Sequence, residues 1–135
     1  MAAPPSPEDH VAITELLARY CLALDLDDVE AWVALFTEDA RYEVFGRVFE
    51  GHEGLRKLLA GAPGGLHLGG LPVIELLDAS RARTTQNLLF VDRATGATRS
   101  AVYDDELRRT ERGWRFAKRR CRFIVAGGLG DRPAS

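Results

Sequence analysis

The first part of the chain carries apolar residues at helical spacing. Ser6 suits the N-cap of a helix and Pro7 its first position, and apolar residues then recur every three or four positions. These residues are Ile13, Leu16, Leu17, Tyr20 and Leu24. The pattern predicts an amphipathic helix that begins at Pro7 and ends near Asp25.

Two shorter helices are expected next. Asp27 or Asp28 can cap a helix that ends before Thr37, and its buried side would hold Val29, Trp32, Val33 and Phe36. A third helix is predicted from Gly51 to Gly61, because apolar residues again follow helical spacing there. Those residues are Leu55, Leu58 and Leu59.

The remaining apolar residues follow the period of two that is typical of strands. The alternation begins at Ala40, and Gly46 and Arg47 are expected to form a turn into a second short strand. A glycine- and proline-rich loop is expected over residues 62–71. Further strands are predicted at residues 73–77, 82–91, 99–110 and 114–125. Residues 1–6 and 127–135 are expected to be frayed tails.

The order of these elements indicates an α+β fold, with helices first and a run of antiparallel strands after them. Three helices packed on one face of a strongly curved, mostly antiparallel sheet would leave one pocket between the two layers. No linker or repeat divides the sequence, so residues 1–135 are expected to form a single domain.

Composition and charge exclude several classes of protein. Apolar residues make up 46% of the chain and charged residues 28%, the balance of an ordinary globular protein. The longest uncharged stretch, residues 58–74, is broken by glycine and proline, so no membrane helix is expected. The N-terminus lacks the features of a secretory signal, which indicates a cytoplasmic protein. Cys21 and Cys121 are expected to be buried thiols.

Several kinds of site are not indicated by the sequence. The spacing of His, Cys and acidic residues matches no metal site, and no glycine-rich phosphate loop or G-x-S-x-G motif is present. Arginines crowd residues 108–122, but the net charge is −2, so they indicate a solvated strand face and not a nucleic-acid interface. His10 and His52 are expected on the surface. The sequence therefore predicts neither a cofactor nor a metal.

Four residues have the chemistry of a proton-transfer site. Asp25 borders the apolar face of the first helix, where a carboxylate could act as a base or hold a histidine, or could simply cap the second helix. His67 lies among glycines, either turned inward as a proton carrier or solvated in a loop. Tyr20 and Tyr42 could donate hydrogen bonds to a substrate carbonyl, or could pack in the core.

Other residues are candidates for the pocket wall. Trp32, Phe36 and Tyr103 would give it an apolar, aromatic lining. Gln86 and Asn87 lie on opposite faces of their strand, so one of them should face inward. Asp105 shares a face with Tyr103, where it could act as a second acid or form a salt bridge to Arg119 or Arg122.

The sequence resembles the SnoaL-like branch of the nuclear-transport-factor-2-like superfamily. The segments that carry the resemblance are ITELLARY at residues 13–20, ALD at 23–25, ALFTEDA at 34–40 and GWRF at 113–116. The resemblance implies a cone-shaped fold with one pocket. Within that branch the chain is most similar to the group of scytalone dehydratase and bile-acid 7α-dehydratase.

That resemblance assigns roles to particular residues. It implies that Asp25 and His67 form a proton-transfer pair and that Tyr20 and Tyr42 help to polarise a carbonyl. The second histidine of scytalone dehydratase falls near Gln86, so the dehydratase set is incomplete here. The resemblance also implies a homodimer, or a trimer, that pairs through the open face of the sheet, with residues 82–91 as a possible contact.

Two functions are therefore expected from the sequence. The first is a cofactor-independent lyase or isomerase, such as a dehydratase, double-bond isomerase or cyclase. It would act by acid–base proton transfer on a cyclic, largely apolar carbonyl compound, such as a polyketide or steroid-like metabolite. The alternative is a non-catalytic module that binds a small molecule or serves assembly.

Overall fold

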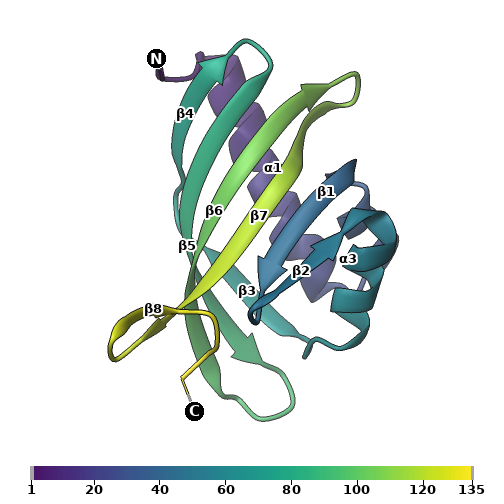
Figure 1. The fold of residues 1–135 in the computed structure, drawn as a ribbon, viewed down its shortest axis with the longest axis vertical. Helices are drawn as coiled ribbons and strands as arrows, with labels where there is room; N and C mark the ends of the chain where they lie inside the picture. The colour runs from purple at the N-terminus through teal and green to yellow at the C-terminus, as the bar shows by residue number, and fades with distance from the viewer. Residues whose placement is uncertain (1, 135) are drawn as a thin grey trace.

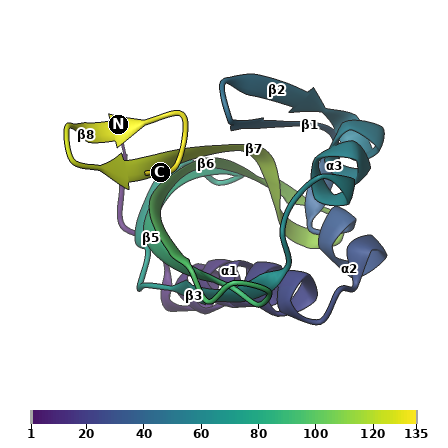
Figure 2. The ribbon, with the colours of Figure 1, turned by 90° about the horizontal axis from the view of Figure 1, so that it is seen from below.

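The fold is a strongly curved sheet with a long helix lying across its concave side (Figures 1 and 2). A computed structural model describes residues 2–134, in which three helices and eight strands are formed. The helices are α1 (Pro7–Asp25), α2 (Val29–Val33) and α3 (Gly51–Ala60). The strands are β1 (Phe36–Val44), β2 (Arg47–Glu50), β3 (Gly65–Gly69), β4 (Val73–Asp78), β5 (Arg81–Asp92), β6 (Thr98–Thr110), β7 (Gly113–Val125) and β8 (Gly128–Gly130).

All eight strands belong to one mixed sheet. Its order is β2-β1-β7-β6-β5-β3, with β4 also paired to β5 and β8 to β7. β1 runs parallel to β7, whereas the other pairs are antiparallel. The predicted α+β class and the mixed, mostly antiparallel sheet are therefore confirmed.

Helix α1 begins and ends where the sequence predicts. The Oγ atom of Ser6 accepts a hydrogen bond of 3.1 Å from the backbone N–H of Asp9, and the helix ends at Asp25. Its buried stripe faces the concave side of the sheet. Helix α2 lies beside one end of α1, and α3 packs against α2, β1 and β2 (Figure 2). This arrangement places the C-terminal end of α1 next to β3.

Strand β1 begins earlier than the sequence predicts. The helical spacing placed Phe36 in the second helix, but that helix ends at Val33 and Phe36 pairs in parallel register with Phe116 of β7. The backbone N–H of Phe116 donates a hydrogen bond of 2.9 Å to the carbonyl oxygen of Leu35. Pairing with β7 therefore overrides the local helical pattern.

The predicted loop at residues 62–71 contains strand β3. Residues Gly65–Gly69 pair with β5, and His67 lies directly opposite Phe90. A Cβ atom at Gly65 would stand 2.1 Å from the carbonyl oxygen of Val91, so glycine permits a close approach of the two backbones there. His67 is consequently part of a paired strand and not of a flexible loop.

The two ends of the chain are more ordered than expected. Residues Gly128–Gly130 form β8 against β7, and Ala3 forms an antiparallel bridge with Leu76. Cys21 and Cys121 are both buried and free, as predicted. Across residues 2–134, no helix is long and apolar enough to cross a membrane.

The outward face of β5 is largely polar. Residues at even positions from Ala82 to Phe90 are buried, whereas the outward positions are Arg83, Thr85, Asn87 and Leu89. The apolar residues that suggested a subunit contact therefore lie inside the protein. The homodimer stays a prediction. If β5 forms part of its interface, the large apolar side chain that it exposes there is Leu89.

An irregularity in β7 turns an arginine into the core. Trp114 and Phe116 are buried at even positions, but the register with β6 then shifts, and burial continues at the odd positions Arg119, Cys121 and Phe123. One extra residue in a strand reverses the direction of every side chain after it. Arg119 is therefore fully buried, which corrects the expectation that the whole arginine cluster forms a solvated face.

The buried Arg119 pairs with Asp105 of β6. Its Nε and Nη2 atoms donate hydrogen bonds of 2.7 and 2.8 Å to the two carboxylate oxygens. The hydroxyl of Thr84 on β5 donates a third hydrogen bond, of 2.8 Å, to Asp105. The pair therefore connects three neighbouring strands, and it confirms the salt bridge to Arg119 that the sequence allowed.

We predict that Asp105→Asn strongly destabilises the fold. The substitution leaves the Arg119 guanidinium buried without its counter-charge, which should lower the free energy of unfolding by roughly 3–5 kcal/mol. Urea denaturation monitored by circular dichroism measures the change. The control is Asp104→Asn, which removes a partly exposed carboxylate that pairs with Arg122, and should change stability by about 1 kcal/mol or less. Equal effects of the two substitutions would refute the importance of the buried pair.

Candidate active site

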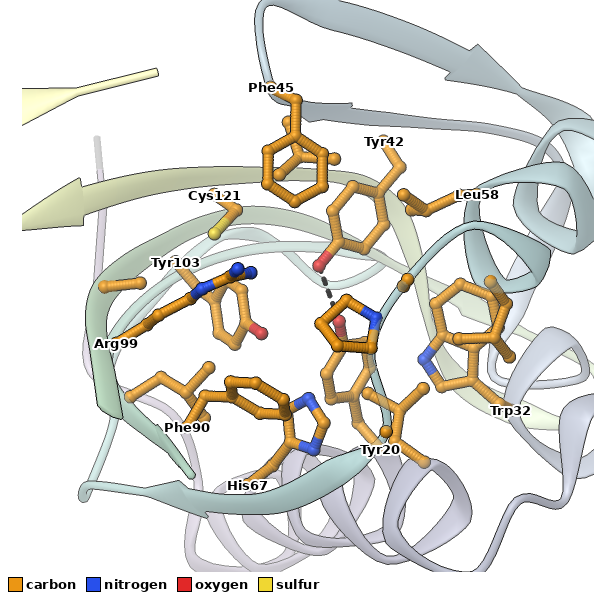
Figure 3. A pocket seen from close by; sticks show the side chains of 18 of the residues that line it. Tyr20, Trp32, Tyr42, Phe45, Leu58, His67, Phe90, Arg99, Tyr103 and Cys121 are labelled. Carbon is orange, nitrogen blue, oxygen red and sulfur yellow. Dashed lines mark hydrogen bonds between the residues drawn. The ribbon is translucent and has the colours of Figure 1, made fainter. Parts of the chain in front are cut away.

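A cavity of about 230 Å³ lies between α1 and the concave side of the sheet (Figure 3). Its walls come from the three helices and from strands β1, β3, β5, β6 and β7, and they are mostly aliphatic and aromatic. The polar or ionisable side chains in the lining are Tyr20, Asp27, Trp32, Tyr42, His67, Arg99, Tyr103 and Cys121. A cavity of this kind suits a compact, largely apolar ligand with a few polar groups.

His67 and Asp25 form a hydrogen-bonded pair at the edge of this cavity. The Nδ1 atom of His67 lies 2.7 Å from Oδ1 of Asp25. The backbone N–H of His67 also donates to both oxygens of Asp25, at 2.9 and 3.2 Å. The last residue of α1 is thereby attached to β3, and its carboxylate fixes the orientation of the imidazole ring.

The environment keeps the imidazole neutral near pH 7. Burial lowers the pKa of His67 below 6.5, the hydrogen bond and charge of Asp25 oppose that shift, and the charge of Arg119 adds to it. Because a carboxylate accepts but does not donate, the proton of the neutral ring lies on Nδ1. Nε2 then has a free lone pair, so His67 can accept a proton from a bound ligand.

Two tyrosines meet on another wall of the cavity. The hydroxyl oxygens of Tyr20 and Tyr42 are 2.6 Å apart, and Figure 3 shows this contact as a dashed line. Burial raises the pKa of Tyr20, Tyr42 and Tyr103, so all three phenols stay protonated at neutral pH. One of the two phenol protons forms the hydrogen bond between Tyr20 and Tyr42. The other phenol proton is free to be donated to another acceptor, such as a ligand oxygen.

The guanidinium group of Arg119 lies beneath the tyrosine rings. Its central carbon is 3.8 Å from the ring centroid of Tyr103 and 4.2 Å from that of Tyr20. A cation over an aromatic face is electrostatically favourable, especially away from water. The buried ion pair therefore also supports the wall that presents the phenols.

The structure brings together most of the residues that the sequence singled out. Tyr20, Trp32, Tyr42, His67 and Tyr103 all line the cavity. Asp25 is not in the lining, but it is hydrogen-bonded to the ring of His67, which is.

Three residues expected in the pocket wall lie outside it. Phe36 packs in the core with its ring centroid 5.0 Å from that of Trp32. Gln86 faces inward, as one of the two neighbours had to, but its amide nitrogen donates to the carbonyl oxygen of Gly70 at 2.9 Å. Asp105 is engaged by Arg119.

The two other histidines lie away from the cavity lining. His10 is exposed, as predicted. His52 was also expected on the surface but is half-buried, and its Nε2 atom lies 3.1 Å from the carbonyl oxygen of Phe36.

Some cavity residues were missed by reading the sequence alone. Phe90 and Arg99 line the cavity and lie opposite each other on β5 and β6. The alternation along β6 could have located Arg99, because it shares a strand face with Ala101 and Tyr103. In the described part of the chain, no cluster of three or more His, Cys, Asp or Glu side chains could hold a metal ion.

Comparison with known proteins places these features in context. A family model described as the SnoaL-like domain matches residues 5–120. A protein of unknown function with a cystatin-like fold from Nostoc punctiforme is 25% identical, with a TM-score of 0.82 over 92% of this chain and 97% of that one. Rv3472 of Mycobacterium tuberculosis, also of unknown function, is 29% identical, with a TM-score of 0.81 over 90% and 80% of the two chains.

A more distant structure shares the fold. Hexachlorocyclohexane dehydrochlorinase (LinA) Type2 is 19% identical, with a TM-score of 0.75 over 96% of this chain and 94% of that one. No protein of curated function matches the sequence.

We predict that the His67 imidazole titrates below pH 6.5 in the folded protein. Burial disfavours the charged ring, whereas the Asp25 carboxylate favours it, so Asp25→Asn should lower the titration midpoint further. NMR titration of the imidazole carbons measures both midpoints, and His67→Ala assigns the signal. A midpoint above 6.5, or one that Asp25→Asn does not move, would contradict this account of the pair.

Proposed function

This chain belongs to the SnoaL-like domain family, and from that membership and the geometry of its cavity we propose that it is a lyase or isomerase that uses no cofactor. The observation that carries the proposal is the hydrogen bond from Nδ1 of His67 to Asp25, which leaves Nε2 of a residue in the cavity lining without a partner among the described residues. The substrate is a cyclic, largely apolar carbonyl compound that bears an acidic C–H next to the carbonyl group.

The first step is the transfer of a proton from carbon to His67. Nε2 of His67 takes the proton, and the electron pair of the broken C–H bond moves through the adjacent carbon to the carbonyl oxygen, which forms an enolate. The imidazolium is stabilised by the carboxylate of Asp25. The developing negative charge on oxygen accepts a hydrogen bond from the free phenol proton of the Tyr20–Tyr42 pair.

The fate of the enolate determines the reaction. If a hydroxyl group leaves from the next carbon, the imidazolium of His67 returns its proton to that oxygen and water is released. If the proton returns to a different carbon, a double bond has migrated. If the enolate carbon attacks a second carbonyl, the new carbon–carbon bond closes a ring, and the alkoxide formed from that carbonyl takes the proton from the imidazolium. The three reactions share the first proton transfer, which the cavity supports directly.

The cavity also supplies a donor that the protein itself does not use. The Nε1–H group of Trp32 is buried and, among residues 2–134, has no hydrogen-bond partner. Figure 3 shows that this nitrogen is turned toward the interior of the cavity. An unsatisfied buried donor costs roughly 1–3 kcal/mol, so a ligand oxygen that accepts from it would recover that cost. This supports a ligand that carries an oxygen acceptor.

Elimination is the subtype that the structural comparison favours. The distant neighbour named as a dehydrochlorinase supports elimination as a reaction that this fold can host. One observation favours the alternative of a non-catalytic binding module. Gln86, where the resemblance placed a second histidine, is turned to Gly70 and away from the cavity lining.

We predict that His67 is required for turnover. Against a panel of aromatic polyketide ketones and ketosteroids, His67→Ala should lower kcat by on the order of 10²- to 10⁴-fold, the usual contribution of a positioned acid–base group. Mass spectrometry detects loss of water, and ultraviolet absorption detects a migrated double bond. The exposed His10→Ala is the matched control and should retain full activity.

The acid limb of the pH profile provides a second check. In wild type, kcat/KM should fall as the pH drops through the titration of His67, below pH 6.5, because the protonated ring cannot accept a proton. If His67→Ala binds and converts a compound as wild type does, the proton-transfer mechanism is wrong. If both proteins bind ligands and neither converts any, the binding module replaces the enzyme.

A further inference from the structure

Three residues on adjacent strands form a row across the floor of the cavity. His67 of β3 lies opposite Phe90 of β5, and Phe90 lies opposite Arg99 of β6. Neighbouring strands are about 4.8 Å apart, so the Cα atoms of His67 and Arg99 are separated by about 10 Å. The three side chains all line the cavity, and the ring centroids of His67 and Phe90 are 4.9 Å apart.

Arg99 brings a positive charge to this row that no carboxylate balances. Its guanidinium carbon lies 6.0 Å from the ring centroid of Phe90, and within residues 2–134 the side chain forms no ion pair and no hydrogen bond. In Figure 3 the guanidinium group extends over the cavity. Arg99 therefore presents its donors to whatever occupies the cavity.

The nearby carboxylates are already engaged. Asp27 also lines the cavity, but both of its oxygens accept hydrogen bonds from Arg93, at 2.8 and 3.0 Å. Asp25 is bound by His67. The charge of Arg99 consequently has no internal counterpart among the cavity side chains, and an anion in the cavity would complement it.

We propose that the ligand of this cavity carries a carboxylate that Arg99 binds. The ring system of the ligand lies over Phe90 and presents the reacting carbon to His67. The separation across the row suits one or two fused rings between the carboxylate and that carbon. The inference rests on the proposed function for the role of His67, but binding of the carboxylate is measured without turnover.

The test compares matched acids and esters. Benzoate and 2-naphthoate are titrated into the full chain by isothermal titration calorimetry, and each is compared with its neutral methyl ester. Wild type should bind at least one acid more tightly than its ester. Arg99→Gln should weaken binding of that acid by roughly 10- to 100-fold, the usual effect of losing a charge-assisted hydrogen bond. Binding of the ester should change by less than about 2-fold.

Two variants control for charge and folding. Arg99→Lys keeps the charge and should retain part of the preference for the acid. Arg83→Gln makes the same change of net charge on the outward face of β5, outside the cavity lining, and should bind both probes as wild type does. Circular dichroism shows that each variant is folded. NMR shifts of the His67 ring on addition of the acid locate the probe in the cavity.

The outcomes separate this proposal from the proposed function. Preferential, Arg99-dependent binding of an acid supports the proposal even if His67→Ala later proves to have no effect on turnover. The proposal is overturned if the acids bind no better than their esters, if no acid binds at millimolar concentration, or if Arg99→Gln and Arg83→Gln have equal effects. In those cases Arg99 is a solvated residue at the cavity rim.

Discussion

Much of this structure depends on the ion pair between Arg119 and Asp105, which solvent does not reach. Both side chains are 0% exposed, and removing two charges from water is costly unless they are paired and hydrogen-bonded. The pairing requires that β5, β6 and β7 hold one register, because Thr84, Asp105 and Arg119 come from the three strands in turn. It also requires the irregularity in β7, without which Arg119 would face outward. The register of the three central strands is thus tied to one guanidinium group.

The same charge influences the chemistry of the cavity. Arg119 lies under the rings of Tyr20 and Tyr103, and its field opposes protonation of His67. Asp25 acts in the opposite direction on the same imidazole. At Cys121 the effect of burial outweighs that of the Arg119 charge, so the pKa of the thiol is raised to about 12 and the thiol stays un-ionised. The site therefore holds a neutral base, neutral phenols and a neutral thiol, although an arginine lies directly beneath it.

The sequence pattern was sufficient to predict those helices and strands whose burial repeats with a regular period along the chain. The stripe of α1 and the alternation in β5 and β6 predicted these elements because burial repeats within each of them. The start of β1 and the whole of β3 depend on strand pairing with residues far away, which no local period reports. The pairing of Asp25 with His67 was expected from family resemblance, since spacing along the chain does not show that residues 42 positions apart meet. For Asp105 the alternation gave the correct face, and for Gln86 and Asn87 it required only that one of the two face inward. It did not give the distance of these residues from the cavity along the strand, where Gly70 engages Gln86 and Arg119 engages Asp105.

The close approach of β3 to β5 has a consequence for reshaping this cavity. At Gly65, and at Gly70 just beyond β3, an added Cβ atom would stand 2.1 Å from the Val91 carbonyl oxygen and 1.8 Å from the side-chain oxygen of Asn87. A side chain at Gly65 would therefore require the backbone to move, whereas one at Gly70 would require the side chain of Asn87 to turn away. The opposite wall is built from ordinary side chains of α3, such as Leu58 and Leu59, which can be exchanged for larger or smaller ones. A protein engineer, and equally natural selection, would alter the range of accepted molecules from the α3 side and leave the β3 side fixed.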